Sequence, residues 1–336
     1  MACQPRCSFL TVTTHRHVAC NGLGGTHEAI HIPCIRIKRR PDVRMTHRGD
    51  RKADTRPFFL ATFPARRTVL PMSTSKLRIG SVPYLNARVL IHGLDGQPES
   101  TLELHPPSIL ARKLAAGELD AALVSSIEYL RHPEYRAVPG LSISGLHEMW
   151  SIRLFHRVPV ERIRTVALDR ASETTNALLR ILLKERWRLE PEYRAGEAGG
   201  RSGERGAAGD EDAFLLIGDR ALAFDDPAWQ ALDLTRVWRE LTGRPFVFAL
   251  WQVRPGIDIG SLGARLRRCR DEGLRQAESI AACEAVRYGR PYEWTLRYLR
   301  DIVCYDFGAE ERAGLRGFQS YLLAHGLLDR KRDDLD

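Results

Sequence analysis

Long apolar runs are missing from this 336-residue sequence, and so is any excess of charge after its first 71 residues. No uninterrupted apolar run reaches the roughly 18 residues that a membrane-spanning helix needs, so we expect no membrane partner. Residues 1–71 hold 13 Lys and Arg against 4 Asp and Glu, whereas residues 72–336 hold 38 of each. Because binding to nucleic acid depends largely on basic side chains, this neutral main part predicts no nucleic-acid partner.

The common catalytic motifs are also missing after residue 71. There is no Gly-rich phosphate loop ending in Gly-Lys-Ser/Thr, and no G-x-G-x-x-G following a strand. A G-x-S-x-G elbow and an H-E-x-x-H helix are absent too. Since the six histidines in this part are not spaced like metal ligands, we expect neither a metal nor an organic cofactor.

Cysteine is scarce after residue 71, where only Cys269, Cys283 and Cys304 occur. An odd number at wide spacing predicts small buried thiols in a reducing compartment rather than a disulfide framework. No secretory signal precedes them, so we predict a cytoplasmic location.

The basic leader, residues 1–75, lacks a sustained helical or strand period. We interpret it as a disordered tail or a mis-assigned start, with translation beginning at Met72. An Arg-rich organelle targeting peptide is the alternative. The cysteines and histidines of the leader match no familiar zinc spacing.

From Lys76 onward, short apolar runs alternate with helical patterns, which is typical of an α/β fold with a mainly parallel sheet. The predicted strands are Leu77–Val82, Thr101–His105, Ala121–Val124, Met149–Phe155, Val166–Leu168, Ala213–Ile217 and Pro245–Val253.

This order predicts two α/β lobes with a central cleft. The first lobe combines residues 76–157 with 255–330, and the second, residues 158–254, is an insertion with a flexible Gly-rich loop at 196–209. The chain then crosses between the lobes near residues 157 and 252. Two such crossings allow hinge closure on a small molecule.

Three strand-to-helix turns are rich in small hydroxyl and amide side chains: Gly80–Asn86, Val124–Ser126 and Ser172–Asn176. In open α/β sheets, ligands bind at the carboxyl ends of strands, where helix amino-termini offer free N–H groups to a carboxylate or phosphate. For each turn taken singly, plain helix capping is the simpler explanation. Asn86 is the exception, because Pro83 blocks a helix there and the amide needs partners.

Several collinear segments resemble the chorismate dehydratase family, the first enzymes of the futalosine pathway of menaquinone biosynthesis. The resemblance runs from about residue 77 to 328, and its segments are Arg78–Arg88, Glu118–Leu130, Val166–Thr175, Leu215–Asp219 and Leu241–Trp251. It implies the periplasmic-binding-protein type II fold and the dehydration of chorismate to 3-[(1-carboxyvinyl)oxy]benzoate. It also implies that the substrate's own enolpyruvyl carboxylate takes the proton.

The resemblance further implies roles for individual residues. Asn86 would stabilise the developing negative charge, and Ser126 or Ser125 would orient the substrate or the leaving hydroxyl. The remaining substrate-binding residues would be Ser81, Tyr84, Gly145, Ser172, Thr174, Thr175 and Trp251, although Trp251 fits a core position equally well.

Two other functions stay open from the sequence. One is the sister enzyme that forms 1,4-dihydroxy-6-naphthoate on the same fold, and the other is a non-catalytic solute-binding protein, because a fold does not fix a function. A homodimer is also compatible with the sequence.

Overall fold

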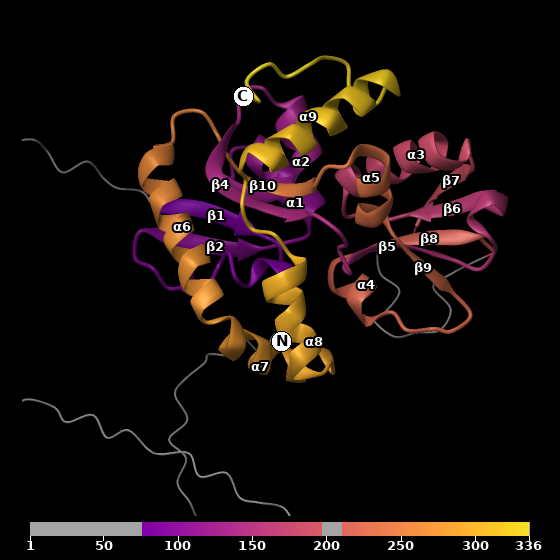
Figure 1. The fold of residues 1–336 in the computed structure, drawn as a ribbon. Helices are drawn as coiled ribbons and strands as arrows, with labels where there is room; N and C mark the ends of the chain where they lie inside the picture. The colour runs from indigo at the N-terminus through magenta and orange to yellow at the C-terminus, as the bar shows by residue number, and fades with distance from the viewer. Residues whose placement is uncertain (1–75, 197–209, 336) are drawn as a thin grey trace, which may run out of the picture. The chain divides into compact units, whose positions relative to one another are not determined.

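A computed structural model describes residues 76–196 and 210–335. The leader prediction for residues 1–75 therefore lies outside the described residues, and so does nearly all of the loop predicted at 196–209. Two five-stranded sheets, each with its own helices, make up the described part (Figure 1).

The first sheet has the strand order β2-β1-β3-β10-β4. Strands β1, β2 and β3 are parallel, while β10 runs antiparallel to both β3 and β4. The strands are β1 (Leu77–Ser81), β2 (Ser100–Leu104), β3 (Ala121–Ser125), β4 (Arg136–Gly145) and β10 (Phe246–Val253). The buried, uninterrupted apolar runs of β3 and β10 explain their central positions.

Helices α1, α2, α6 and α9 contact this first sheet, and α7, α8 and η3 continue the helical C-terminal part (Figure 1). The elements are η1 (Leu85–Ala87), α1 (Pro107–Ala115), α2 (Ser126–Arg131), α6 (Ile259–Arg275), α7 (Ala277–Tyr288), α8 (Tyr292–Arg297), η3 (Tyr298–Ile302) and α9 (Ala309–Ala324). We call this assembly the first lobe.

The second lobe repeats the arrangement, with the strand order β7-β6-β8-β5-β9. Here β6 is parallel to β7 and β8, and β5 is antiparallel to β8 and β9. The elements are β5 (Ile152–His156), η2 (Val160–Arg162), β6 (Thr165–Leu168), α3 (Glu173–Trp187), β7 (Glu192–Ala195), β8 (Ala213–Ile217), α4 (Gly218–Ala223), β9 (Gln230–Asp233) and α5 (Leu234–Thr242). Both sheets are mixed, not mainly parallel.

The predicted lobe boundaries were wrong at both crossings. Strand β5 belongs to the second sheet, although residues up to 157 were predicted in the first lobe. Strand β10 belongs to the first sheet, although residues up to 254 were predicted in the second. The chain crosses at 146–151 and 243–245. The error arose because β4, which contains Pro139 and Gly140, was not recognised as a strand, and an apolar strand shows the same pattern in either sheet.

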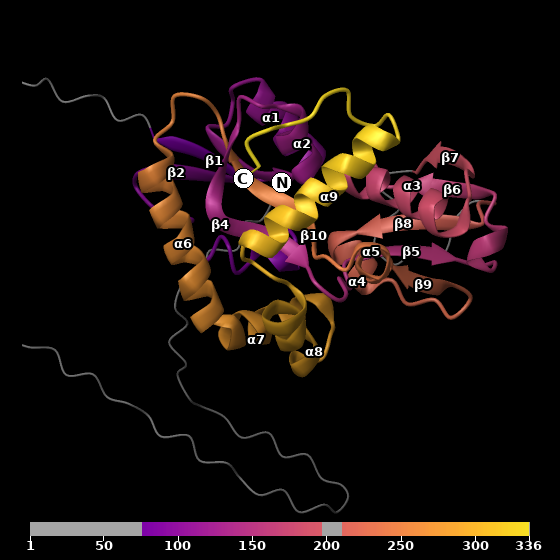
Figure 2. The same ribbon diagram turned by 45° about the horizontal axis from the view of Figure 1, so that its top comes forward.

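Helix α9 packs against β10 in the first lobe and also against α3 in the second (Figures 1 and 2). At its end, His325 Nε2 lies 2.8 Å from a carboxylate oxygen of Glu185 in α3. The fully buried Trp238 of α5 in the second lobe packs edge-on against Phe246 of β10 and Phe318 of α9 in the first lobe. The lobes therefore share packed surface as well as the two crossings.

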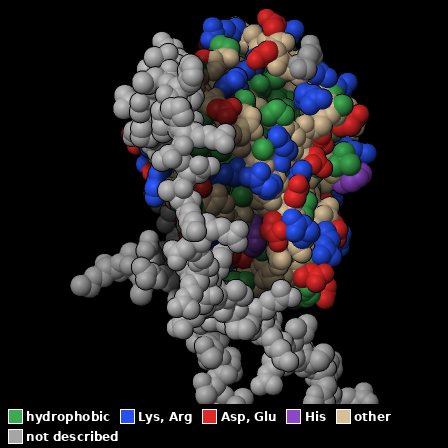
Figure 3. Space-filling model, turned by 90° about the vertical axis from the view of Figure 1, so that its left-hand side faces the viewer, with side chains coloured by type: hydrophobic (Ala, Val, Ile, Leu, Met, Phe, Trp, Pro, Cys, Tyr) green, Lys and Arg blue, Asp and Glu red, His purple; other side chains and the backbone are tan. Residues whose placement is uncertain are grey.

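Two further predictions can be compared with the described residues. None of the helices in residues 76–196 and 210–335 is long and apolar enough to cross a membrane. Cys269 is buried as expected, but Cys304 is only partly buried and Cys283 is exposed, so the prediction of buried thiols was right only for Cys269. On the face drawn in Figure 3, basic and acidic side chains intermingle.

Candidate functional site

Four strand-to-helix turns, two from each lobe, meet where the lobes touch. Strands β1 and β3 are parallel neighbours, so the turns that lead into η1 and α2 lie at one edge of the first sheet. Strands β6 and β8 are parallel neighbours too, which places the starts of α3 and α4 at one edge of the second sheet. The structure thus joins the three turns expected from the sequence to a fourth, at Gly218–Asp219.

Two hydrogen bonds connect these turns across the lobes. The backbone N–H of Ile127 in α2 donates to Thr174 Oγ1 in α3 over 2.9 Å, and both groups are buried. The backbone N–H of Leu85 in η1 donates to Asp219 Oδ1 in α4 over 2.8 Å. Each bond satisfies an N–H group at the start of a helical turn, where no partner within the turn is available.

The three predicted residues at the start of α3 have different roles: two of them cap the helix, and the third contacts the other lobe. Ser172 is the N-cap, and its hydroxyl accepts a hydrogen bond from the Thr175 N–H and lies 3.0 Å from Thr175 Oγ1. Ser172 and Thr175 therefore complete the start of α3 itself. Thr174 alone of the three points to the opposite lobe.

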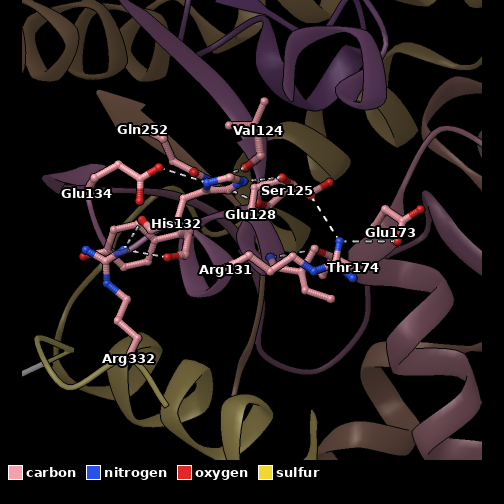
Figure 4. A network of polar contacts seen from close by, with 12 residues as sticks. Val124, Ser125, Glu128, Arg131, His132, Glu134, Glu173, Thr174, Gln252 and Arg332 are labelled. Carbon is pink, nitrogen blue, oxygen red and sulfur yellow. Dashed lines mark hydrogen bonds and ion pairs between the residues drawn. The ribbon is translucent and has the colours of Figure 1, made fainter. Parts of the chain in front are cut away.

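The two serines before α2 also differ. Ser126 is fully buried, and its hydroxyl donates to the Val247 carbonyl in β10 over 2.7 Å. The Ser125 side chain makes no hydrogen bond to any described residue, while its carbonyl accepts one from Gln252 Nε2 (Figure 4). Ser125 is thus the serine whose hydroxyl is available to a ligand.

Two arginines make contacts at the C-terminal end of helix α2. Arg131 lies 3.5 Å from Glu128 in α2 and also 3.5 Å from Glu173 in α3, as Figure 4 shows. Just beyond this same end, the buried Arg332 guanidinium donates to the carbonyls of Tyr129, His132 and Tyr135. The Tyr129 and His132 carbonyls lie where α2 ends, so Arg332 helps to fix that end.

The turn after β1 carries two predicted residues with unusual surroundings. Asn86 is buried, and its Oδ1 has no hydrogen-bond partner among the described residues. Burial raises the pKa of the Tyr84 hydroxyl to about 12, so this group is protonated at neutral pH. The Tyr84 ring lies against Gly218 in the second lobe.

Two buried carboxylates of the second lobe border this contact. Asp169 accepts hydrogen bonds from the N–H groups of Ala171 and Ile217 and from the Arg220 guanidinium. Asp219 accepts from the Leu85 N–H and, over 2.6 Å, from the Tyr288 hydroxyl. Burial raises the pKa of both carboxyls, and these donors partly offset that effect.

Three predicted residues lie farther from the facing turns or make only internal contacts. Ser81 ends β1, is fully buried, and its hydroxyl reaches the Val82 carbonyl at 3.5 Å. Gly145 ends β4 at the same sheet edge, and a Cβ there would lie 3.0 Å from Thr235 Cγ2. Trp251 is fully buried in the middle of the sheet, opposite Leu123.

Sequence reasoning missed Asp219, Tyr288, Ser151 and Tyr298, which the fold brings to the same place. Asp219 had a signal, because it follows an apolar strand and a glycine as the other turns do. Ser151 lies in the first crossing and Tyr298 in the helical C-terminal part, and no local pattern marked either.

A cavity of about 520 Å³ lies beside the first crossing, between Leu146–Glu148 and Arg300–Asp306. None of the predicted site residues lines it. In the described residues there is also no group of three or more His, Cys, Asp or Glu side chains that could hold a metal ion.

Two lobes with matching mixed sheets, two short crossings and facing strand-to-helix turns define a two-lobed type II periplasmic-binding-protein fold. Comparison with solved structures agrees. A protein from Archaeoglobus fulgidus superposes with a TM-score of 0.60 at 19% identity, covering 76% of this chain and all of that one. A Candida albicans gene product, described as having the generic periplasmic binding protein structural fold, gives 0.54 at 10% identity, covering 78% of this chain and 93% of its own.

The sequence comparisons identify the family. A family model described as menaquinone biosynthesis matches residues 77–324, and the chain belongs to that family. A chorismate dehydratase of Thermus thermophilus is 32% identical over 274 residues, which cover 73% of this chain and 94% of that enzyme. The fold and family expected from the sequence are confirmed.

Proposed function

We propose that this protein dehydrates chorismate to 3-[(1-carboxyvinyl)oxy]benzoate in menaquinone biosynthesis. The buried Asn86 side chain at the junction of the four turns carries the proposal, because its amide Nδ2 group is a neutral donor, together with the similarity to a chorismate dehydratase. Chorismate carries two carboxylates, and the junction offers neutral donors that can hold them from both lobes.

The reaction is a balanced elimination. The C–H bond beside the ether oxygen breaks, the neighbouring C–OH bond breaks, and the electron pair left by the proton completes an aromatic ring while water leaves. Such a step depends on positioning and on stabilisation of the growing charge more than on a strong base.

The surroundings of the carboxylates support removal of the proton by the substrate itself. Asp169 and Asp219 are the buried carboxylates beside the Tyr84–Gly218 contact, and each already accepts hydrogen bonds from two or more donors. Both oxygens of each carboxylate already accept hydrogen bonds, so neither carboxylate is suited to act as a general base. The substrate's enolpyruvyl carboxylate then takes the proton.

The proposed roles follow from which polar atoms are unoccupied. Asn86 stabilises negative charge on the substrate through its amide Nδ2 group, and the Ser125 hydroxyl orients the leaving hydroxyl group. When the lobes open, the hydrogen bond between the Ile127 N–H group and Thr174 Oγ1 breaks. When they close again on the substrate, both groups donate to a substrate carboxylate instead. Ser126, Ser172 and Thr175 support these groups through their own hydrogen bonds.

Incubating the full chain with chorismate and following the product by absorbance and chromatography tests the proposal. The expected result is stoichiometric formation of the substituted benzoate and water. Binding of chorismate without turnover would instead indicate a solute-binding protein. Turnover of a cyclised futalosine derivative alone would indicate the 1,4-dihydroxy-6-naphthoate synthase reaction.

A further inference from the structure

Three buried polar atoms without hydrogen-bond partners gather beside the junction: Asn86 Oδ1, Ser151 Oγ and Tyr298 Oη. Ser151 and Tyr298 are fully buried, and Asn86 is 6% exposed. The Tyr298 hydroxyl is near enough to the Ser151 and Asn86 side chains for both to lower its pKa, against the larger effect of burial, which raises it. None of these contacts is a well-formed hydrogen bond.

The atoms come from three separate segments that the fold brings together. Asn86 lies in η1, Ser151 in the first crossing between the lobes, and Tyr298 in η3, which packs against η1. The Ser151 carbonyl accepts a 2.8 Å hydrogen bond from the Gly218 N–H, which ties the crossing to the start of α4. The cluster therefore adjoins the contact between Leu85 and Asp219.

Buried polar groups in native proteins nearly always have partners, because leaving one unpaired is unfavourable. A single unpaired atom could reflect local packing. Three from distant segments, adjoining the proposed substrate site, indicate a place that a polar ligand atom completes.

The Tyr298 side chain is held rigidly. Its ring stacks with Trp150 at 6.2 Å and with Trp294 at 6.0 Å between centroids. It also begins η3, a π-helical turn, and such turns occur often at functional sites. Rigid aromatic neighbours fix the hydroxyl in one position, as a preorganised donor requires.

The group is also a neutral donor. Burial holds the pKa of the Tyr298 hydroxyl well above its ordinary value of 10, so it keeps its proton at neutral pH. The nearby Asp219 carboxylate already accepts from the Leu85 N–H and the Tyr288 hydroxyl, so it leaves Tyr298 free to donate elsewhere.

We propose that the Tyr298 and Ser151 hydroxyls donate hydrogen bonds to the departing hydroxyl oxygen of the substrate, on which negative charge grows during the elimination, while Asn86 Oδ1 accepts a hydrogen bond from that hydroxyl. This proposal rests on the proposed function and adds two substrate-binding residues to it. Tyr298 donates a hydrogen bond without giving up its proton. The proton that the departing oxygen acquires is the one removed from the substrate's ring carbon.

The test compares Tyr298→Phe and Ser151→Ala with a matched control, Tyr305→Phe. Tyr305 is also a buried tyrosine whose hydroxyl has no partner in the described residues, and it lies on the same C-terminal segment. We expect Tyr298→Phe to lower kcat by about 100-fold with less than a threefold change in KM, the effect of losing one transition-state donor. Ser151→Ala should lower kcat in the same direction by a smaller factor, and Tyr305→Phe should leave both constants unchanged.

A thermal unfolding measurement separates this role from a structural one. Since Tyr298→Phe removes a hydroxyl that is unpaired without substrate, its melting temperature should equal or exceed that of the unsubstituted protein. A lower melting temperature with unchanged kinetics would overturn the proposal. Equal loss of kcat in Tyr298→Phe and Tyr305→Phe would also overturn it.

The outcome remains decisive if the protein does not convert chorismate. In that case the proposed function fails, and calorimetric titration with 3-hydroxybenzoate tests the subsite separately. At least tenfold weaker binding to Tyr298→Phe than to the unsubstituted protein supports the subsite. Equal binding, or no binding to either protein, overturns it.

Discussion

Asn86 and Thr174 are both buried polar residues at the junction of the lobes, but only Thr174 makes a hydrogen bond across that junction. Thr174 accepts the Ile127 N–H, whereas Asn86 Oδ1 has no partner among the described residues. Because of this difference, we assign Thr174 to the contact between the lobes and Asn86 to the contact with a ligand. The chemical identity of the side chains, both small and polar, does not reveal it.

Asn86→Ala should lower kcat by about 100- to 1,000-fold and change KM by less than threefold, because the amide acts on charge that develops only in the transition state. Steady-state kinetics with chorismate measures both constants. A proportionate rise in KM with unchanged kcat would show instead that Asn86 contributes only to ground-state binding.

Ser125→Ala and Ser126→Ala form a matched pair with opposite expected results. Ser125→Ala should lower kcat/KM about tenfold with unchanged stability, because only its hydroxyl is unoccupied. Ser126→Ala should lower the free energy of unfolding by about 1–2 kcal/mol, because it leaves the buried Val247 carbonyl without its donor. Urea unfolding together with kinetics distinguishes them, and a reversed pattern would reassign the substrate contact to Ser126.

At the scale of elements, one carboxylate ties together several strands of the first sheet. Asp120, just before β3, accepts from the Arg78 N–H in β1 at 2.9 Å and from the Arg78 guanidinium at 2.7 Å. It also accepts from Arg254, just after β10, at 3.0 Å. Burial alone would raise the pKa of Asp120, but these donors outweigh it and hold the pKa below 3.8.

Asp120→Asn should therefore lower the free energy of unfolding by about 2 kcal/mol at pH 7, less than for a fully buried pair because the arginines are partly exposed. A carboxyl with a lowered pKa in the folded state stabilises the protein above its unfolded pKa. That stabilisation is lost as the pH falls through the folded pKa. The difference between the two proteins should accordingly shrink as the pH falls below the ordinary titration range of aspartate.

Urea unfolding of both proteins at pH 7 and pH 3 measures this dependence. Glu118→Gln is a suitable control, since the Glu118 side chain is 60% exposed and its contact with Lys113 is 3.5 Å. A difference for Asp120→Asn that stays constant with pH would contradict the assignment.

At the scale of the whole described structure, the two lobes touch beside the proposed site. The first lobe contributes Tyr84 and Leu85, the second contributes Gly218 and Asp219, and their contact adjoins the proposed site. Gly218 has a φ of +61°, and a Cβ there would lie 2.9 Å from the Tyr84 ring. Both the positive φ and the lack of room for a Cβ atom favour glycine at this position.

Gly218→Ala should push the lobes apart and lower kcat/KM by at least tenfold, because misplaced catalytic groups lose much of their effect. Gly289→Ala is the matched control, because Gly289 has the same φ of +61° but open space around its Cβ position. We expect both substitutions to destabilise the protein by about 1–2 kcal/mol through backbone strain. Equal activity in the two variants would show that the Tyr84 contact is unimportant for catalysis.

The sequence by itself determined most of the strands, the α/β class, the family and the turns at the carboxyl ends of β1, β3 and β6. Local apolar runs and small polar residues after them carry that information, because they depend on neighbours along the chain. Only the tertiary structure decided that β5 and β10 belong to the sheets opposite to those expected. Only the tertiary structure showed that the Ser126 hydroxyl is hydrogen-bonded to another described residue while the Ser125 hydroxyl is not. It also showed that Ser151 and Tyr298 adjoin Asn86. The physical reason is that sheet membership, hydrogen-bond partners and burial depend on contacts between residues far apart in the chain, which a local pattern does not record.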